Sequence, residues 1–422
     1  MQRRQMLHSL LAVSAAASFS NVSRAANAAA TTPHFDSARW APLNAARIQA
    51  LIAQYGKGSP TWNPARKPYA VFDWDNTSIM NDCEEALFMY QINNLAFKLE
   101  PAEFSALVRR DLPDLSFKKE NGFATIDGKA VTAHDLADDV ASDYAWLRAA
   151  QASGKSMDDL RQTPQFLDFR AKLYFMYDAV CDALPIEVGY KWIIYLFANQ
   201  TQAEVMALAQ ASNNNGLGDG LKKMKYQSPA ELPGKAGVIA TTHFHGLRIH
   251  EENRALMHTL RANGIDVYVS TASLDDVVRV FAGHADYGYE VAQENVIGLR
   301  LEIKDGKYLA QYRKSWHFNW GPGKTVGIQN ELVAKKGYGP LLVLGDSDGD
   351  AWMLRDFPDT QLGIIINRLK KGEIGLDSQK AAAAIGQADA RFVLQGRDEH
   401  TGLMIPDEKT IKYGKGEKKL LA

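Results

Sequence analysis

The chain has 422 residues, of which 46% are apolar and 23% charged, and its 48 Lys and Arg nearly balance its 49 Asp and Glu. This composition is that of a folded globular protein and excludes disordered, collagenous and coiled-coil classes. The formal net charge of −1 offers no basic excess for a phosphate backbone, so we expect no nucleic-acid partner. With only Cys83 and Cys181, a disulfide framework and a cysteine zinc site are excluded, and a single bridge stays open.

The first 28 residues have the three regions of a secretory signal peptide. Arg3 and Arg4 form a charged start, residues 6–19 form a modestly apolar stretch, and Ala26-Asn27-Ala28 offers small residues for cleavage. The paired arginines resemble a twin-arginine export signal, and Sec export stays open. No later run approaches the roughly 18 apolar residues of a membrane span. We therefore expect a periplasmic or secreted protein with no stable membrane association after signal removal.

Residues 29–77 are predicted to form an N-terminal wrap and the first strand of a core domain. A helix is predicted over residues 42–55, where Gly56 would end it. Residues 69–73 form a continuous apolar run after a proline, which is typical of a strand buried on both faces of a parallel sheet. From residue 78 to residue 264 the periodicity is mostly helical, and we predict a helical cap domain there.

The alternation of strands and helices then resumes, and residues 265–422 are predicted to complete the core. The expected elements are a helix over 251–263, strands over 265–269, 340–344 and 362–367, a hairpin of 296–301 with 308–312, and a helix over 324–336. Strand, crossover helix and strand repeated in this way predict an α/β fold, a doubly wound parallel sheet interrupted by a helical insertion after its first strand.

Polar side chains follow three of these strands, at the edge where doubly wound sheets bind ligands. With one lysine that opens the helix over 324–336, they are Asp73, Asp75, Thr77, Ser270, Lys324, Asp346 and Asp350. Converging carboxylates repel one another unless a cation lies among them. Oxygen ligands in this number favour Mg²⁺, and a hydroxyl with a lysine suits phosphoryl oxygens.

This order of motifs resembles the haloacid dehalogenase superfamily, and its phosphatases in particular. The resemblance rests on Asp-x-Asp-x-Thr at residues 73–77, a strand ending in Ser270, the later Lys324, and Gly-Asp-Ser-x-x-Asp at residues 345–350. It covers about residues 69–77 and 265–367, and the helical stretch between them looks like the cap of that superfamily. Among its members, the motifs are most similar to those of secreted phosphorylcholine phosphatases.

The resemblance implies that Asp73 attacks phosphorus and forms an aspartyl phosphate. Asp75 would protonate the leaving alcohol and then activate water, and Thr77 would brace the turn between the strand and the cap. Because the dehalogenases of the superfamily need no acid at the second position, Asp75 favours hydrolysis of a phosphate ester.

The resemblance also implies how the phosphoryl group and the metal are held. Ser270 and Lys324 would hold the phosphoryl group. Asp346 would bind Mg²⁺ together with the side chain of Asp73 and the carbonyl of Asp75. Asp350 fits either a second ligand or the partner of Lys324.

Substrate recognition is expected in the cap. Glu84 and Glu85 lie just beyond the first motif, where related phosphatases place a carboxylate that reads the substrate. Aromatic residues follow in the cap: Tyr144, Trp146, Tyr174, Tyr190 and Trp192. Aromatic faces with a nearby carboxylate bind quaternary ammonium groups, which makes phosphocholine a candidate substrate. The alternative is that the aromatic residues form the cap core and the acids a solvated helix start.

We therefore interpret the chain as an exported, Mg²⁺-dependent phosphomonoesterase acting on a small phosphate ester. The substrate could equally be another small alcohol phosphate. A phospho-signalling receiver module and a non-catalytic binding protein for a phosphorylated small molecule stay open as alternatives. His243 and His245 form a His-x-His pair without a third ligand, so we predict no metal there. The sequence does not predict the oligomeric state.

Overall fold

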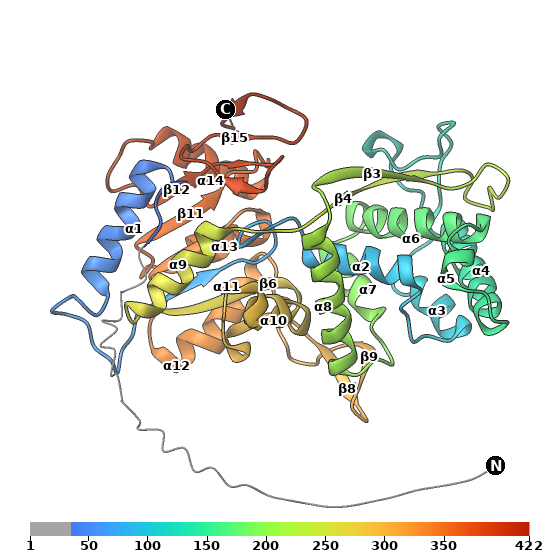
Figure 1. Ribbon diagram of the computed structural model, residues 1–422, viewed down its shortest axis with the longest axis horizontal. Coiled ribbons are helices and arrows are strands. Elements are labelled where there is room, and N and C mark those ends of the chain that lie inside the picture. Colours follow the sequence, from blue (N-terminus) through green and yellow to red (C-terminus); the bar gives the residue numbers. More distant parts are fainter. Residues whose placement is uncertain (1–34, 422) are drawn as a thin grey trace, which may run out of the picture. The chain divides into compact units, whose positions relative to one another are not determined.

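The computed structural model describes residues 35–421, so the expected signal peptide, residues 1–28, lies outside it. At its centre is a six-stranded sheet whose neighbouring strands are all parallel, in the order β12-β11-β10-β1-β6-β7 (Figure 1). The strands are β1 (Tyr69–Phe72), β6 (Asp266–Leu274), β7 (Val296–Leu299), β10 (Leu342–Gly345), β11 (Leu362–Ile366) and β12 (Phe392–Gln395). The predicted α/β fold with a parallel sheet is confirmed.

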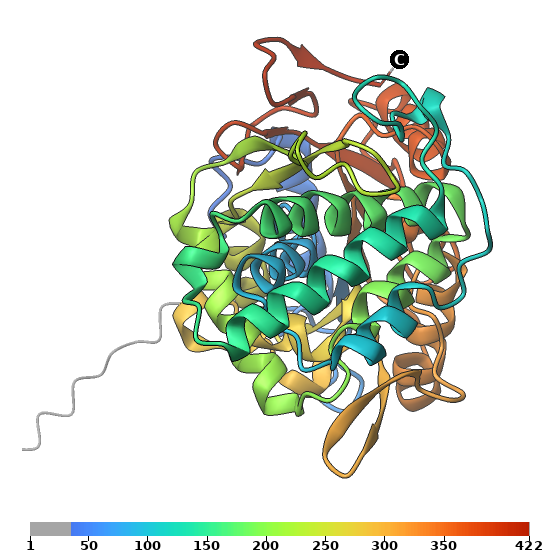
Figure 2. The ribbon, with the colours of Figure 1, turned by 90° about the vertical axis from the view of Figure 1, so that its right-hand side faces the viewer.

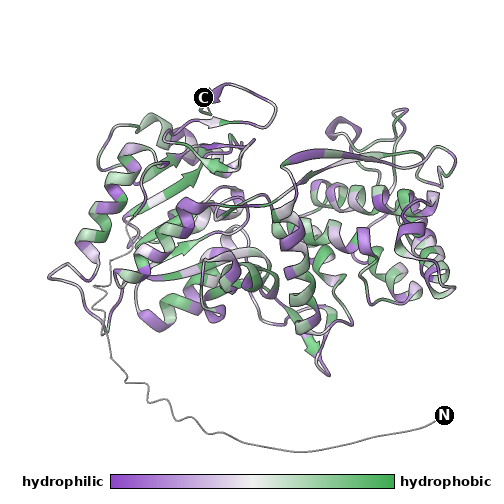
Figure 3. Ribbon diagram, in the orientation of Figure 1, coloured by the Kyte–Doolittle hydropathy of each residue, from purple (hydrophilic) through white to green (hydrophobic). Residues whose placement is uncertain are grey.

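Helices cover both faces of this sheet because alternate side chains of each strand point to opposite faces. Ala70 and Phe72 of β1 belong to a core shared with one set of helices, and Tyr69 and Val71 to a core shared with another. The first set is α1 (Pro42–Tyr55), α9 (Glu251–Ala262) and α10 (Asp275–Gly283), and the second is α11 (Pro322–Ile328), α13 (Ala351–Arg355) and α14 (Glu373–Ala383). The core strands are largely hydrophobic in Figure 3, as burial on both faces requires.

The long connection between β1 and β6 is mostly helical, as predicted. It contains α2 (Cys83–Asn94), α3 (Pro101–Val108), α4 (Ala133–Ala152), α5 (Met157–Leu160), α6 (Pro164–Ala183), α7 (Ile186–Tyr195) and α8 (Gln202–Gly218), and we call these helices the insert. Figure 2 shows several of them side by side. Phe104 and Tyr144 stack in its core with ring centroids 3.9 Å apart. An antiparallel ribbon follows, β3 (Lys222–Gln227) with β4 (Ala240–His245).

Two short strands pair where the chain enters and leaves this region, β2 (Ile79–Met80) and β5 (Arg248–Ile249). The next helix, α9, falls within the range 78–264 predicted for the cap, but it packs against core strand β6. The helix α9 therefore belongs with the core, because it forms the crossover that a parallel strand needs.

The predicted hairpin was wrong in its first strand. Val296–Leu299 forms β7 at the edge of the core sheet, and the hairpin consists of β8 (Leu301–Lys304) and β9 (Lys307–Tyr312). The turn at Asp305 and Gly306 is as predicted, with both residues at positive φ. A single apolar run was thus divided between two sheets.

The expected helix over residues 324–336 is divided into α11, a π-helical turn (Gln329–Val333) and α12 (Ala334–Lys336). After β12, a small sheet was not predicted: β13 (Arg397–Asp398), β14 (Leu403–Met404), β15 (Thr410–Ile411) and β16 (Lys418–Lys419). Cys83 and Cys181 are free thiols. Among the described residues, no helix has the length and apolarity to cross a membrane.

Candidate functional site

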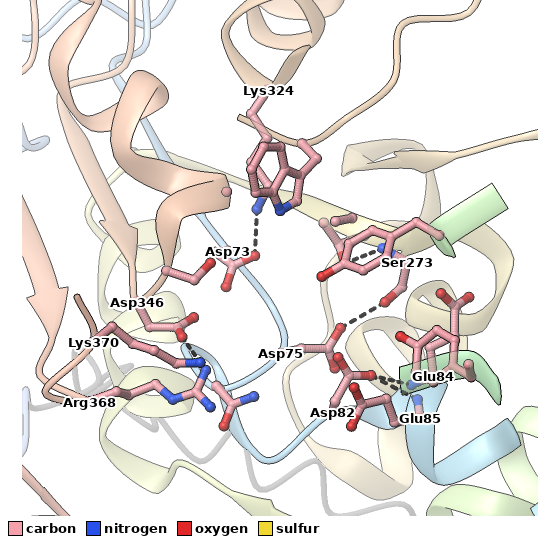
Figure 4. Close-up of a pocket in the computed structure, with 18 residues that line it drawn as sticks. Asp73, Asp75, Asp82, Glu84, Glu85, Ser273, Lys324, Asp346, Arg368 and Lys370 are labelled. Atoms are coloured by element: carbon pink, nitrogen blue, oxygen red, sulfur yellow. Dashed lines mark hydrogen bonds and ion pairs between the residues drawn. The ribbon is translucent and has the colours of Figure 1, made fainter. Parts of the chain in front are cut away.

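A cavity lies beyond the carboxyl ends of β1, β6 and β10 and is closed by the start of the insert (Figure 4). Of the residues expected at the site, it is lined by Asp73, Asp75, Glu84, Glu85, Lys324 and Asp346. Thr77, Ser270 and Asp350 do not line it, but each is buried and hydrogen-bonded to a lining residue. These residues lie together because ligand sites in such a sheet form beyond the carboxyl ends of the strands.

Lys324 lies between two carboxylates. Its Nζ donates to Asp73 Oδ1 at 2.6 Å and to Asp350 Oδ1 at 2.7 Å, and all three side chains are at most 9% exposed. Burial and the neighbouring Asp350 raise the pKa of Asp73 well above its usual value, and Lys324 offsets part of this rise. Burial lowers the pKa of Lys324, but the two carboxylates more than compensate and raise it overall. The lysine therefore stays charged beside Asp73.

Asp350 has both carboxylate oxygens occupied. Its Oδ2 accepts from the backbone nitrogens of Asp346 and Ser347, at 2.9 and 3.0 Å, and its Oδ1 accepts from Lys324. Of the two roles left open for Asp350, this geometry favours the partner of Lys324.

Asp346 is also held by two groups. Thr77 Oγ1 donates to its Oδ1 at 2.8 Å, and Arg368 Nη1 donates to its Oδ2 at 2.5 Å. Burial acts to raise the pKa of Asp346, but Arg368, Arg397 and the Thr77 hydroxyl together lower it. Asp346 is therefore an ionised carboxylate in a buried setting.

The donor set fits a hard divalent cation. Within residues 35–421, one group of acids or histidines brings three ligand atoms within 4.8 Å of one another, and it consists of Asp73, Asp346 and Asp350. All three offer carboxylate oxygen, which is the ligand type that Mg²⁺ prefers. Because Asp73 and Asp346 line the cavity and Asp350 does not, Asp73 and Asp346 are the side chains best placed to hold the ion.

Asp75 lies at the junction of the core and the insert. Its Oδ1 accepts from the backbone nitrogen of Cys83 at 2.7 Å, and its Oδ2 accepts from Ser273 Oγ at 2.9 Å. Burial raises the pKa of Asp75, and these two hydrogen bonds offset part of the rise. A carboxyl group with a raised pKa binds a proton more readily, as an acid catalyst requires.

Ser270 is buried and does not line the cavity. Its Oγ accepts from Asn319 Nδ2 at 3.1 Å, and its carbonyl accepts from Lys324 Nζ at 2.8 Å. The strand continues to Leu274, so the wall is formed by Thr271, Ala272 and Ser273 instead. A phosphoryl role for the Ser270 hydroxyl stays a prediction, and the structure places the next three residues nearer to the cavity.

The start of α2 forms an acidic wall, which we define as Asp82, Glu84 and Glu85. Asp82 Oδ1 caps the helix by accepting from the backbone nitrogens of Glu84 and Glu85. Burial raises the pKa of Glu84 to about 8, although its Oε1 accepts from Leu274 N at 2.9 Å. Burial and the nearby Asp75 raise the pKa of Glu85, and Arg368 and Lys370 offset part of that rise. The side chain of Glu85 lines the cavity without an ion-pair partner among the described residues.

Of the aromatic residues named from the sequence, only Tyr190 lines the cavity. Tyr144 is stacked in the insert core, Tyr174 bonds to His243, Trp192 is buried, and Trp146 is 38% exposed. Tyr177 and Trp320 also line the cavity and were missed. Tyr177 carried no signal of its own, because the helical pattern of α6 does not separate core residues from cavity residues.

Arg368 and Lys370 were also missed, and we call this pair the cationic wall. Both line the cavity just after strand β11 ends at Ile366. In Figure 4 they lie across the cavity from Glu84 and Glu85. The signal was present, because they follow a buried strand just as Asp73 and Asp346 do.

The His-x-His pair is engaged in hydrogen bonds. His243 Nδ1 lies 2.8 Å from Tyr174 Oη, and His245 Nε2 lies 2.6 Å from Tyr226 Oη. Neither histidine belongs to a metal-ligand group in the described part of the chain.

Comparison with known proteins adds two similarities. The chain is 26% identical over 341 residues to the phosphorylcholine phosphatase of Pseudomonas aeruginosa, covering 75% of this chain and 76% of that protein. It is 33% identical to a conserved protein of unknown function from Anaerococcus prevotii, whose crystal structure matches with a TM-score of 0.84 over 90% of this chain and 99% of that one. No family model matches.

The similarity to a phosphatase agrees with the order and placement of the strand-end motifs, and the chain is a phosphoric monoester hydrolase. The prediction of an enzyme is confirmed. More particularly, the resemblance to phosphatases of the haloacid dehalogenase superfamily found in the sequence is confirmed.

Proposed function

We propose that this hydrolase is an exported, Mg²⁺-dependent phosphatase that works through an aspartyl phosphate. The observation that carries the proposal is the placement of Lys324 Nζ, at 2.6 Å from Asp73 Oδ1, in the same cavity as the proton-binding carboxyl of Asp75. Export is supported by the leader pattern of residues 1–28.

In the first step Asp73 attacks phosphorus, the bond from phosphorus to the leaving oxygen breaks, and Asp75 gives its proton to the departing alcohol. In the second step Asp75 takes a proton from water, whose oxygen attacks phosphorus and releases the carboxylate of Asp73. Lys324 offsets part of the rise in the pKa of Asp73, which favours the ionised nucleophile, and it offers positive charge to the phosphoryl oxygens. Mg²⁺ held by Asp73 and Asp346 would supply further charge against those oxygens.

We further propose that the alcohol part of the substrate carries a cation, with phosphocholine as the first candidate. The acidic wall faces the cavity together with Tyr177 and Tyr190, and a carboxylate beside aromatic faces suits a quaternary ammonium group. The phosphorylcholine phosphatase similarity supports the same choice. A neutral alcohol phosphate would leave the half-buried Glu85 without a cationic partner in the cavity.

Phosphate release tests both parts. The protein would be assayed on phosphocholine, phosphoethanolamine, phosphoserine, glycerol phosphate and an aryl phosphate, with Mg²⁺ or with a chelator. We expect metal-dependent release that is fastest on phosphocholine and is lost in Asp73→Asn. Metal-dependent release without that preference would refute the cationic substrate alone, and full turnover by Asp73→Asn would refute the mechanism.

A further inference from the structure

Arg368 forms an ion pair at the position where a metal must bind. Its Nη1 donates to Asp346 Oδ2 at 2.5 Å, and the two side chains are 20% and 1% exposed. The other oxygen of Asp346 accepts from Thr77. Both oxygens of the principal metal-ligand carboxylate are therefore already in use.

A divalent cation at Asp73 and Asp346 must compete with this guanidinium. Arg397 and Lys370 add positive charge nearby. Arg397 lowers the pKa of Asp346, and Lys370, which lines the same cavity, has its own pKa lowered by Arg368. Like charges at such short range repel strongly inside a protein. The cation gains most if Arg368 gives up its bond to Asp346.

The guanidinium of Arg368 has a second possible partner in the cavity, the phosphoryl group of the substrate. Arg368 lines the cavity beside Asp73, and its buried Nε has no hydrogen-bond partner among the described residues. A planar guanidinium donates two parallel hydrogen bonds to phosphate oxygens, which a lysine cannot do. The phosphoryl group that Asp73 attacks is the anion that reaches this part of the cavity.

We propose that Arg368 is an exchangeable counter-ion: it neutralises Asp346 before a divalent cation binds, and after displacement it donates to the phosphoryl group of the substrate. This rests on the proposed Mg²⁺-dependent function. It assigns Arg368 two opposite effects, since the residue weakens metal binding and strengthens phosphate binding. A residue that merely braced Asp346 would strengthen both.

The test measures binding and does not depend on turnover. Mn²⁺ would be titrated into the wild type, Arg368→Gln and Arg368→Lys, with free Mn²⁺ followed by electron paramagnetic resonance. We expect Mn²⁺ to bind at least about tenfold more tightly to Arg368→Gln, because the lost repulsion exceeds the ~1.4 kcal/mol that a factor of ten requires. Arg368→Lys keeps the charge and should bind Mn²⁺ like the wild type. Lys370→Gln removes the same charge without a bond to Asp346, so its effect should be smaller.

Orthophosphate binding would then be measured by calorimetry at saturating Mg²⁺, and we expect Arg368→Gln to bind it about tenfold more weakly, as the loss of a charged hydrogen bond predicts. Thermal unfolding would verify that each variant is folded. Weaker or unchanged Mn²⁺ binding by folded Arg368→Gln overturns the inference and leaves the proposed function intact. A wild type that binds no divalent cation overturns the proposed function, and the inference with it.

Discussion

Replacing Lys324 by methionine removes the cation that lies between the buried carboxylates of Asp73 and Asp350. The side chains of Lys324, Asp73 and Asp350 are 2%, 9% and 0% exposed, so little solvent is present to compensate for the lost partner. Breaking a buried ion pair by removing one member costs about 3–5 kcal/mol. Since Asp73 can bind a proton in response, we expect a loss of folding free energy near the lower end of this range.

Urea unfolding at neutral pH, followed by circular dichroism, measures this loss. Lys335→Met is the matched control, because Lys335 pairs with Glu331 at 3.2 Å with side chains that are 70% and 31% exposed. An exposed pair of this kind contributes at most about 1 kcal/mol. The double variant Lys324→Met with Asp350→Asn should recover part of the stability, because one of the two unpaired charges is gone.

The same change should alter the pH dependence of catalysis. Lys324 lowers the pKa of Asp73, so removing it raises that pKa further and leaves less ionised nucleophile at a given pH. The acid limb of the kcat/KM profile should therefore move to higher pH, and turnover at neutral pH should fall. If Lys324→Met loses no more stability than Lys335→Met and keeps its acid limb in place, the interpretation of this triad is wrong.

Three further outcomes are expected. Asp75→Asn should slow phosphate release from an alkyl phosphate by about 10²–10⁴-fold, the usual contribution of a general acid. The loss in the first step should be smaller with a nitrophenyl phosphate, whose leaving group needs less protonation. Equal losses in the first step for the two substrates would argue against protonation by Asp75. Glu85→Gln should raise KM for phosphocholine and leave KM for glycerol phosphate unchanged. An equal rise in both KM values would show that Glu85 does not contact the cation of the substrate. The folded pKa of Glu84, about 8, exceeds the unfolded value, so stability is lost as pH rises from about 4.5 to about 8. The urea midpoint of Glu84→Gln should therefore rise relative to that of the wild type as the pH increases over this range. A difference between the two midpoints that does not change with pH would contradict the raised pKa of Glu84.

Much of the core could be predicted because its strands are buried on both faces and leave continuous apolar runs. For the same reason Asp73 and Asp346, which follow such runs, could be placed at one edge of the sheet. The run at Val296 was harder, because apolar periodicity cannot tell which partner a strand will pair with. The small sheet β13–β16 has strands of two residues, too short for any periodic pattern.

Other features of the site depend on tertiary packing. The strand that carries Ser270 continues past it to Leu274, so the side chains at the cavity are those of Thr271 and Ser273. Arg397 of the unpredicted small sheet donates to the carbonyl of Asn76 at 2.9 Å, between Asp75 and Thr77. Nothing local in the sequence connects residues that lie so far apart along the chain.

The junction between core and insert links substrate recognition to acid catalysis. The backbone of Cys83, at the start of α2, donates to Asp75, and Glu84 on the same turn accepts from Leu274 at the end of β6. Glu85, the residue proposed to meet the cation of the substrate, belongs to that turn as well. A displacement of this turn would therefore change both the contacts of the substrate and the hydrogen bond from Cys83 that lowers the pKa of Asp75. Because both effects depend on one helix start, we expect a substrate that displaces Glu85 to change the pKa of Asp75 as well.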